Sequence, residues 1–372
     1  MENKTLTSEV CFGFNVFCYF CAFLGLAPFY NSKLNENKNK INNCKRILIG
    51  LFWVIMYAFI FVCQFTNPIY YSHFSVKIAV SFLLVILLSF VASIVSIFTA
   101  FIKKYPSILY KILELNLKEF SPGFCARKQR LLNLTQTFEI ILIITFSVGL
   151  NVCVSFVEGY ISLLYFIDTL IFCSSSLCNN FLTYQYIIAV LLIKRKYFLI
   201  NKYLSNQLKC NTIRKRNVKM ISNDVNMTSL NTRFFHELRI THEQMYDLVA
   251  VINTDYGVPI LFVLCWELIV AISSVHFNLS YSLHLFFILV RLPVICQSAV
   301  NEFKNLKILV QKLMLHNIYG AAVNKELKLL SSQLNSMDIE FSVCGFFALN
   351  LPFLNNVVGL IVSYIVILVQ FK

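Results

Sequence analysis

The sequence predicts an all-α, polytopic membrane protein, and two observations lead to this fold class. Of its 372 residues, 58% are hydrophobic and only 13% are charged, whereas soluble domains are roughly 45–50% apolar and about 25% charged. Apolar runs of 18 or more residues also recur along the chain, and each is long enough to cross a bilayer as a helix. The net charge of +14 is then explained by basic loops at a membrane surface, which argues against a nucleic-acid partner.

Seven apolar runs are predicted as transmembrane helices: 47–65, 76–102, 138–157, 160–193, 258–277, 281–300 and 341–371. The fourth run is longer than a bilayer requires, so we expect its helix to continue into the cytoplasm. The fifth run opens with Pro259, a residue that suits the first turn of a helix. In the second run, four serines are small enough to let helices approach closely: Ser81, Ser89, Ser93 and Ser96.

A further apolar segment, residues 10–30, precedes these runs and contains Gly25 and Pro28. Its start is weakly charged and its end is aromatic, which argues against a cleaved signal peptide. We expect a membrane-associated helix within a cytoplasmic N-terminal segment, residues 1–46. Whether residues 10–30 cross the membrane is left open.

Two polar segments have apolar residues at helical spacing. In residues 194–257 these are Phe234, Leu238, Met245, Leu248 and Val249, and in residues 301–340 they are Leu306, Leu309, Val310, Leu313, Leu327, Leu330 and Leu334. Both segments are therefore predicted to be helical. They separate transmembrane helices one to four (47–193), helices five and six (258–300) and helix seven (341–372).

The distribution of basic residues predicts the orientation. Four segments hold 29 of the 32 Lys and Arg residues: 1–46, 103–137, 194–257 and 301–340. Basic loops face the cytoplasm, so the N-terminus is expected inside and the C-terminus outside. This orientation is the reverse of a G-protein-coupled receptor, and the Asp-Arg-Tyr and Asn-Pro-x-x-Tyr motifs of that class are missing from spans three and seven.

Motifs for enzyme chemistry and cofactor binding are not found. There is no Gly-rich phosphate loop, no HExxH and no Gly-x-Ser-x-Gly, so we expect neither enzymatic activity nor a cofactor. Cys18 and Cys21 lie three residues apart on an apolar face, where packing is the expected role, and no metal site is predicted. His236 and His242 are expected on the surface of a cytoplasmic helix.

The end of the chain resembles the signature of insect gustatory receptors. Residues 363–371 read Ser-Tyr-Ile-Val-Ile-Leu-Val-Gln-Phe, and the family signature is Thr-Tyr, five hydrophobic residues and Gln-Phe. The segment Gly345–Leu351 resembles the family's approach to this helix, and Leu24–Phe29 is similar to its N-terminal Gly-Leu-x-Pro element. The resemblance covers the layout of the whole chain, but only about the last 30 residues in sequence detail.

The resemblance implies a ligand-gated, non-selective cation channel of four subunits, a homo- or hetero-tetramer. Residues 341–372 would line the shared pore for monovalent and divalent cations, and the two polar segments would form a cytoplasmic anchor. A small tastant would bind in a pocket among helices two to six. The implied location is the plasma membrane, in contact with lipid, of a sensory neuron dendrite.

The pore residues follow from the motif and from helical geometry. Gln370 and Phe371 match the family's extracellular gate, where an apolar ring can close by dewetting and amides can line an open pore. Ser363, Val366 and Ile367 lie on the same side of an ideal helix as Gln370. Tyr364 lies about 120° away, so a structural role is expected for its hydroxyl.

Ionisable residues inside predicted spans suggest where the ligand binds, because charge is costly in a bilayer. Asp168, Glu267 and His284 fall in the outer halves of spans four, five and six. Aromatic and polar residues are expected to surround them, as in small-molecule sites: Trp266, Tyr165, Phe172, Asn151, Tyr281 and Phe287. The alternative is a structural ion pair of Arg291 with Asp168 or Glu267. Both interpretations stay open.

The ligand class is predicted by resemblance alone. The main sweet-receptor group carries Glu directly after the motif Tyr, where this chain has Ile365. A bitter plant compound is the first expectation, and a fructose-type sugar is the second. A polytopic transporter is the alternative function, since Pro352 and the polar residues of the last run also suit a broken helix, although no internal repeat accompanies them.

Overall fold

The computed structural model describes residues 48–56, 58–59, 62, 87–99, 163–217, 232–274, 279–316 and 320–370. The predicted membrane-associated segment 10–30 and the third span, 138–157, lie outside these residues. Residues 48–56 and 87–99, in the first and second predicted spans, are helical. The remaining described residues form five longer helices and one hairpin.

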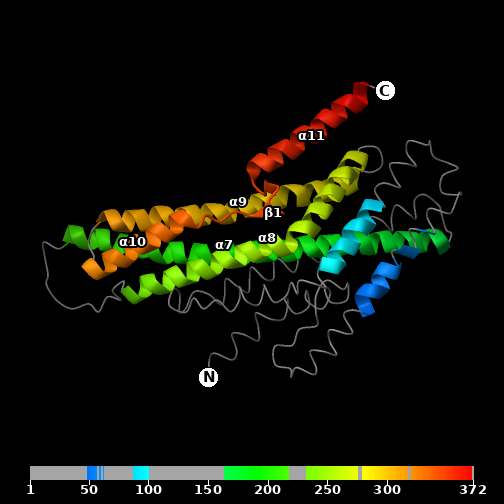
Figure 1. The fold of residues 1–372 in the computed structure, drawn as a ribbon. Coiled ribbons are helices and arrows are strands. Elements are labelled where there is room, and N and C mark those ends of the chain that lie inside the picture. Colours follow the sequence, from blue (N-terminus) through cyan, green and yellow to red (C-terminus); the bar gives the residue numbers. More distant parts are fainter. Residues whose placement is uncertain are drawn as a thin grey trace.

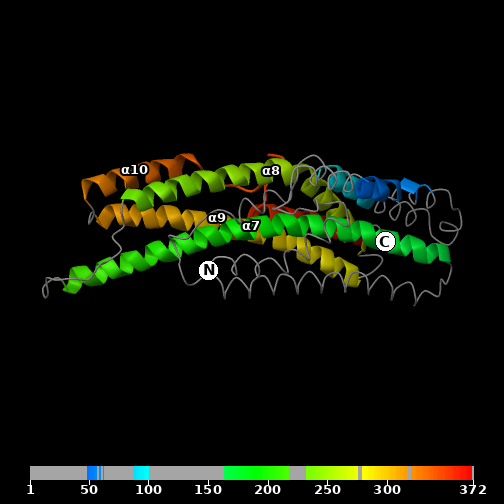
Figure 2. The same cartoon turned by 90° about the horizontal axis from the view of Figure 1, so that it is seen from below.

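Three long helices build the body of the molecule: α7 (Leu163–Asn217), α8 (Thr232–Ser274) and α9 (Leu279–His316). They run side by side along the length of the bundle (Figures 1 and 2). A shorter helix, α10 (Ala321–Ser336), packs against α8 and α9 at one end. The predicted continuation of the fourth run past residue 193 is confirmed, because α7 extends to Asn217.

The apolar stripes predicted in the polar segments are buried. Leu327, Leu330 and Leu334 of α10 are buried, and so are Phe234, Leu238 and Met245 of α8. Side chains at these spacings share one face of a helix, and these faces meet in a continuous apolar core with α7 and α9. Hydrogen bonds also join α7 to α9. Asn201 Nδ2 of α7 donates to the backbone oxygen and to Oε2 of Glu302 on α9, at 2.8 and 2.9 Å.

Two predicted helix starts are wrong. Pro259 lies inside α8 and not in a first turn, since α8 begins at Thr232. Residues 341–350 are not helical, because β1 (Ser342–Val343) pairs antiparallel with β2 (Phe347–Ala348). The cause is a turn in which Cys344 and Gly345 have φ values of 52° and 71°, a conformation that a right-handed helix cannot contain.

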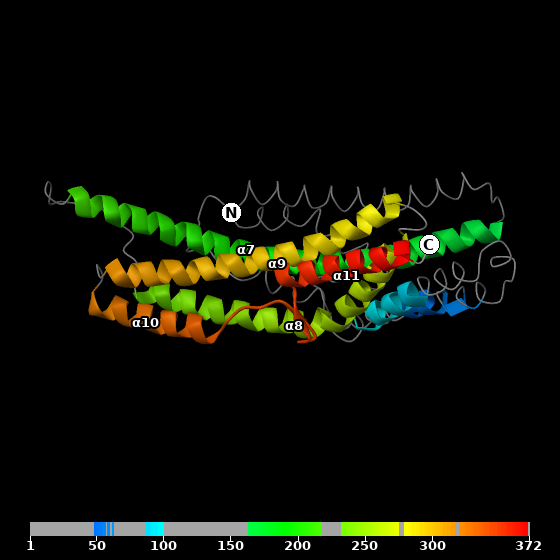
Figure 3. The ribbon, with the colours of Figure 1, turned by 90° about the horizontal axis from the view of Figure 1, so that it is seen from above.

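The last helix, α11 (Leu351–Gln370), begins directly after this hairpin. Asn350 caps it, because its Oδ1 accepts a hydrogen bond of 3.0 Å from the backbone N–H of Phe353. The helix starts near the middle of the bundle and rises away from it (Figure 1). Seen from above, it follows the half of the bundle that contains the end of α8 (Figure 3).

Neighbouring leucines on α10 provide a test of this packing. Leu330 is fully buried, whereas Leu329 is 40% exposed. We expect Leu330→Ala to destabilise the protein by about 2–5 kcal/mol, because it leaves a cavity in the core, and Leu329→Ala to cost much less. The measurement is the apparent melting temperature of the detergent-solubilised protein, and equal losses for both variants would contradict this packing.

Candidate ligand site and pore helix

Trp266 and Glu267 are adjacent residues of α8 with no exposed surface. Within the described part of the chain, neither the indole Nε1 nor the two carboxylate oxygens have a hydrogen-bond partner. Burying such groups without partners is unfavourable. The pair therefore offers one donor and two acceptors to whatever group approaches it.

The structural ion pair considered for Glu267 is not formed with Arg291. The Arg291 guanidinium instead lies 5.6 Å from the centre of the Tyr184 ring, above its face, and no hydrogen bond from Arg291 reaches the Glu267 carboxylate. A cation over an aromatic face is itself a stabilising contact. Among the described side chains, none forms a hydrogen bond with the Glu267 carboxyl group, which can therefore bind another group.

The other predicted ligand residues are placed less completely. Tyr165, Asp168 and Phe172 belong to α7, and Tyr281, His284 and Phe287 belong to α9, with only their backbone described. Asn151 lies outside the described residues. The structural pair of Arg291 with Asp168 is untested for the same reason.

Helical rise gives the relative levels of these residues. Tyr186 of α7 makes an edge-to-face contact with Tyr256 of α8, and its hydroxyl lies 3.9 Å from the sulfur of Cys296 on α9. Counting 1.5 Å per residue from this contact, Glu267 and His284 both lie about 17–18 Å further along their helices, whereas Asp168 lies about 27 Å along α7. Glu267 and His284 are therefore at similar distances along their helices from this contact, and Asp168 is further along α7.

Polar contacts join α7 to the helix Leu87–Thr99 at Asn179, which lies between Asp168 and Tyr186 along α7. Asn179 accepts a hydrogen bond of 3.3 Å from Ser93 Oγ and donates one of 3.4 Å to the backbone oxygen of Ser89. Ser89, Ser93 and Ser96 are all fully buried. Their predicted role in close helix packing is confirmed, and Ser81 lies outside the described residues.

One side of α11 packs on the bundle and the other is exposed. Phe353, Val357 and Ile361 are half-buried, and Ile361 lies about 180° around an ideal helix from Gln370. The predicted pore residues Ser363, Val366, Ile367 and Gln370 are all exposed. In a single chain, the side of α11 that carries Gln370 therefore points away from α8 and α9, against which α11 packs.

The individual roles on α11 remain predictions. Tyr364 lies on the packed side by helical angle, about 60° from Ile361, but it is 39% exposed, close to the 48% of Val366 and Ile367. Phe371 lies outside the described residues.

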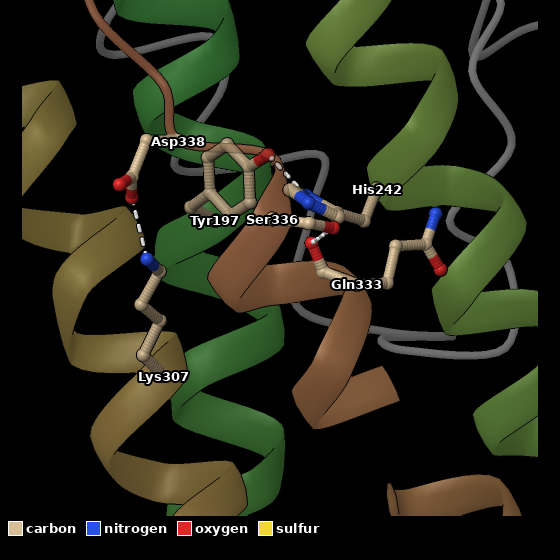
Figure 4. Close-up of polar contacts among 6 residues, drawn as sticks. All are labelled: Tyr197, His242, Lys307, Gln333, Ser336 and Asp338. Carbon is tan, nitrogen blue, oxygen red and sulfur yellow. Dashed lines mark hydrogen bonds and ion pairs between the residues drawn. The ribbon is translucent and has the colours of Figure 1, made fainter. Parts of the chain in front are cut away.

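A buried aromatic cluster lies between α7, α8 and α9 in the predicted cytoplasmic region. The Tyr197 hydroxyl is 3.0 Å from Nδ1 of His242 (Figure 4), and the His242 ring stacks on Phe303 with centroids 5.4 Å apart. His242 is fully buried, so its expected surface position is wrong, whereas His236 is exposed as predicted. The spacing of His242 from Leu238 and Met245 would have indicated the buried side of α8.

The same cluster continues to the surface through Lys307 and Asp338. The Lys307 ammonium forms an ion pair with Asp338 at 2.5 Å (Figure 4), and it also lies 4.9 Å from the centre of the Phe303 ring. Burial, reinforced by the Lys307 cation, lowers the pKa of His242 to about 4. Burial also raises the pKa of Tyr197 well above its usual value, so both rings are neutral at physiological pH.

Within the described residues, no group of three or more His, Cys, Asp or Glu side chains could hold a metal ion. In the same part of the chain, one helix is long and apolar enough to cross a membrane by length and composition alone: Thr232–Val270 of α8.

Comparison with known proteins gives one family and one fold. The family described as 7tm Chemosensory receptor matches residues 14–372. The insect olfactory receptor OR5 from Machilis hrabei, solved in complex with eugenol, is similar in structure, with a TM-score of 0.67 and 12% identity over 100% of both chains. A second structure of OR5 gives a TM-score of 0.64 at 12% identity, covering 96% of this chain and 98% of that chain. No curated protein sequence matches.

These findings confirm the predicted fold class, an all-α, seven-helix membrane protein with an insect-receptor fold. The orientation of the chain remains a prediction.

The two histidines of α8 provide a test of the buried cluster. A buried His with a lowered pKa stabilises the fold fully above about pH 6.5, and this contribution is lost as the pH falls toward 4, at a cost of about 3 kcal/mol. We expect His242→Asn, which keeps a polar atom near Tyr197 but cannot titrate, to reduce the acid sensitivity of the melting temperature. His236→Asn should leave it unchanged, and equal pH profiles for wild type and His242→Asn would contradict the assignment.

Proposed function

The chain belongs to the 7tm chemosensory receptor family, and from this we propose that it is a gustatory receptor that acts as a ligand-gated, non-selective cation channel. The observation that carries the proposal is α11, whose exposed side includes Ser363, Val366, Ile367 and Gln370. A helix that buries one side against its own bundle and exposes a mixed polar and apolar side suits a wall of a pore shared with other copies. Four subunits, identical or different, would complete it.

In this proposal the gate lies at the outer end of α11. Gln370 and Phe371 meet their counterparts around the axis, so that the Phe rings close the pore and the Gln amides line it when it is open. Val366 and Ile367 form an apolar throat below. The chain would sit in the plasma membrane with its N-terminus inside and its C-terminus outside, following the basic residues of 1–46, 103–137, 194–257 and 301–340.

The ligand would bind at the outer level of α7, α8 and α9, around Trp266 and Glu267. Their buried and unpartnered polar atoms favour a small molecule with both hydrogen-bond donors and acceptors, because pockets combine apolar walls with a few polar groups. A bitter plant compound is the first candidate class and a fructose-type sugar the second. Agonist binding would shift the balance between closed and open pores.

Whole-cell recording from cells that express the chain tests this function, with a panel of bitter compounds and sugars as probes. The channel predicts ligand-evoked currents that rise linearly with the concentration of the permeating ion and do not saturate. Saturable uptake coupled to a second solute would instead establish the transporter. If the protein reaches the cell surface but no compound of the panel evokes a current, the result would count against the proposal.

Glu267 provides a separate test of the ligand site. Glu267→Gln keeps the shape of the side chain but replaces one carboxyl oxygen, an acceptor, with an amide nitrogen, so we expect at least a tenfold higher agonist EC50 with normal surface expression. Glu243→Gln, on the exposed surface of the same helix, is the matched control. An unchanged response of the Glu267→Gln variant would remove this residue from the pocket.

A further inference from the structure

The hairpin before α11 is tied to α8 by one side chain. Asn253 Nδ2 donates a hydrogen bond of 2.7 Å to the backbone oxygen of Glu340, and Asn253 Oδ1 accepts one of 3.1 Å from the backbone N–H of Ser342. The amide thus satisfies two backbone groups at the start of β1 and holds that strand in one register on α8. An amide is suited to this, because it offers a donor and an acceptor together.

One turn further along α8, Gly257 lets the turn of the hairpin approach the helix. A Cβ atom at this position would lie 2.9 Å from the backbone nitrogen of Cys344 and 3.2 Å from its sulfur. Contacts this short would force the turn away from α8. Asn253 and Gly257 are four residues apart and therefore share one face of α8, so the hairpin is fixed at two points.

The hairpin is in turn joined firmly to α11. The Leu349 N–H donates to the backbone oxygen of Phe341 at 2.8 Å, which closes the hairpin. Phe347 of β2 stacks on Phe353 of α11, with ring centroids 4.7 Å apart, and Asn350 caps the first turn. The base of α11 therefore follows the position of the hairpin.

From these contacts we propose that Asn253 is a positioning residue for the gate, a role that rests on the proposed channel function. The helix α11 is about 30 Å long, with its attachment at one end and Gln370 at the other. A rotation of about 5° at the base displaces the outer end by about 2.6 Å over this length. This displacement is enough to separate apolar side chains that must touch to exclude water, so closing the pore requires a fixed base.

The test is the ratio of agonist-independent current to maximal agonist-evoked current, which does not depend on the number of channels. We expect Asn253→Ala to raise this ratio at least fivefold, because a loosened base leaves the gate ring incomplete. Asn253→Asp keeps the acceptor for the Ser342 N–H but not the donor to Glu340, and should give a smaller rise. Thr254→Ala is the matched control, since among the described residues this exposed hydroxyl bonds within its own helix, to the backbone oxygen of Val251.

A ratio within twofold of wild type for Asn253→Ala, with wild-type agonist responses intact, overturns this inference alone. If Asn253→Ala fails to reach the surface, Gly257→Ala disturbs the same contact from the other residue and should also raise the ratio, and an unchanged ratio there overturns the inference as well. A wild-type protein that reaches the surface but never conducts overturns the proposed function and this inference with it.

Discussion

The turn at Cys344 and Gly345 is the constraint on which the placement of α11 depends. Residues 341–371 contain no charged side chain, and a single helix of that length would measure about 46 Å, well beyond the roughly 30 Å of a hydrocarbon core. Two consecutive positive φ values remove the first ten residues from the helix. The remaining 20 residues of α11 match the core thickness, and the hairpin satisfies its own backbone groups against Asn253 of α8.

The described structure thereby divides into a densely packed part and a lightly packed part. Apolar stripes and the Tyr197–His242–Phe303 cluster bind α7, α8, α9 and α10 into one core, where a change of volume or charge is costly. By contrast, α11 contacts this core through one side, which includes Phe353 and Ile361, while Val362, Ser363, Val366, Ile367 and Gln370 are exposed. Under the proposed channel function, this arrangement would let the open and closed states differ in the position of α11 without unpacking the bundle.

The sequence was sufficient for the features that depend on periodicity. Leucines at helical spacing identified the buried side of α10, and the serines of the second span identified a close helix contact.

The sequence was insufficient where local signals compete with tertiary structure. Pro259 lies within α8 because packing of a long helix can tolerate the missing hydrogen bond, and His242 is buried because Tyr197 and Phe303 complement its ring. The hairpin was missed because Cys344 carries no turn preference. Which side chains surround Glu267 depends on how the helices are placed, and residue spacing alone cannot supply that placement.

The central claim is that the side of α11 bearing Gln370 lines a cation pathway shared by four copies. Its most direct test is the ratio of Ca²⁺ to Na⁺ permeability, measured from reversal potentials of agonist-evoked currents. Gln370→Glu would place a ring of carboxylates on the pathway, and such rings favour cations, so the ratio should rise severalfold, whereas the uncharged Gln370→Met should leave it near or below wild type. An unchanged reversal potential in a Gln370→Glu channel that still conducts would contradict the claim.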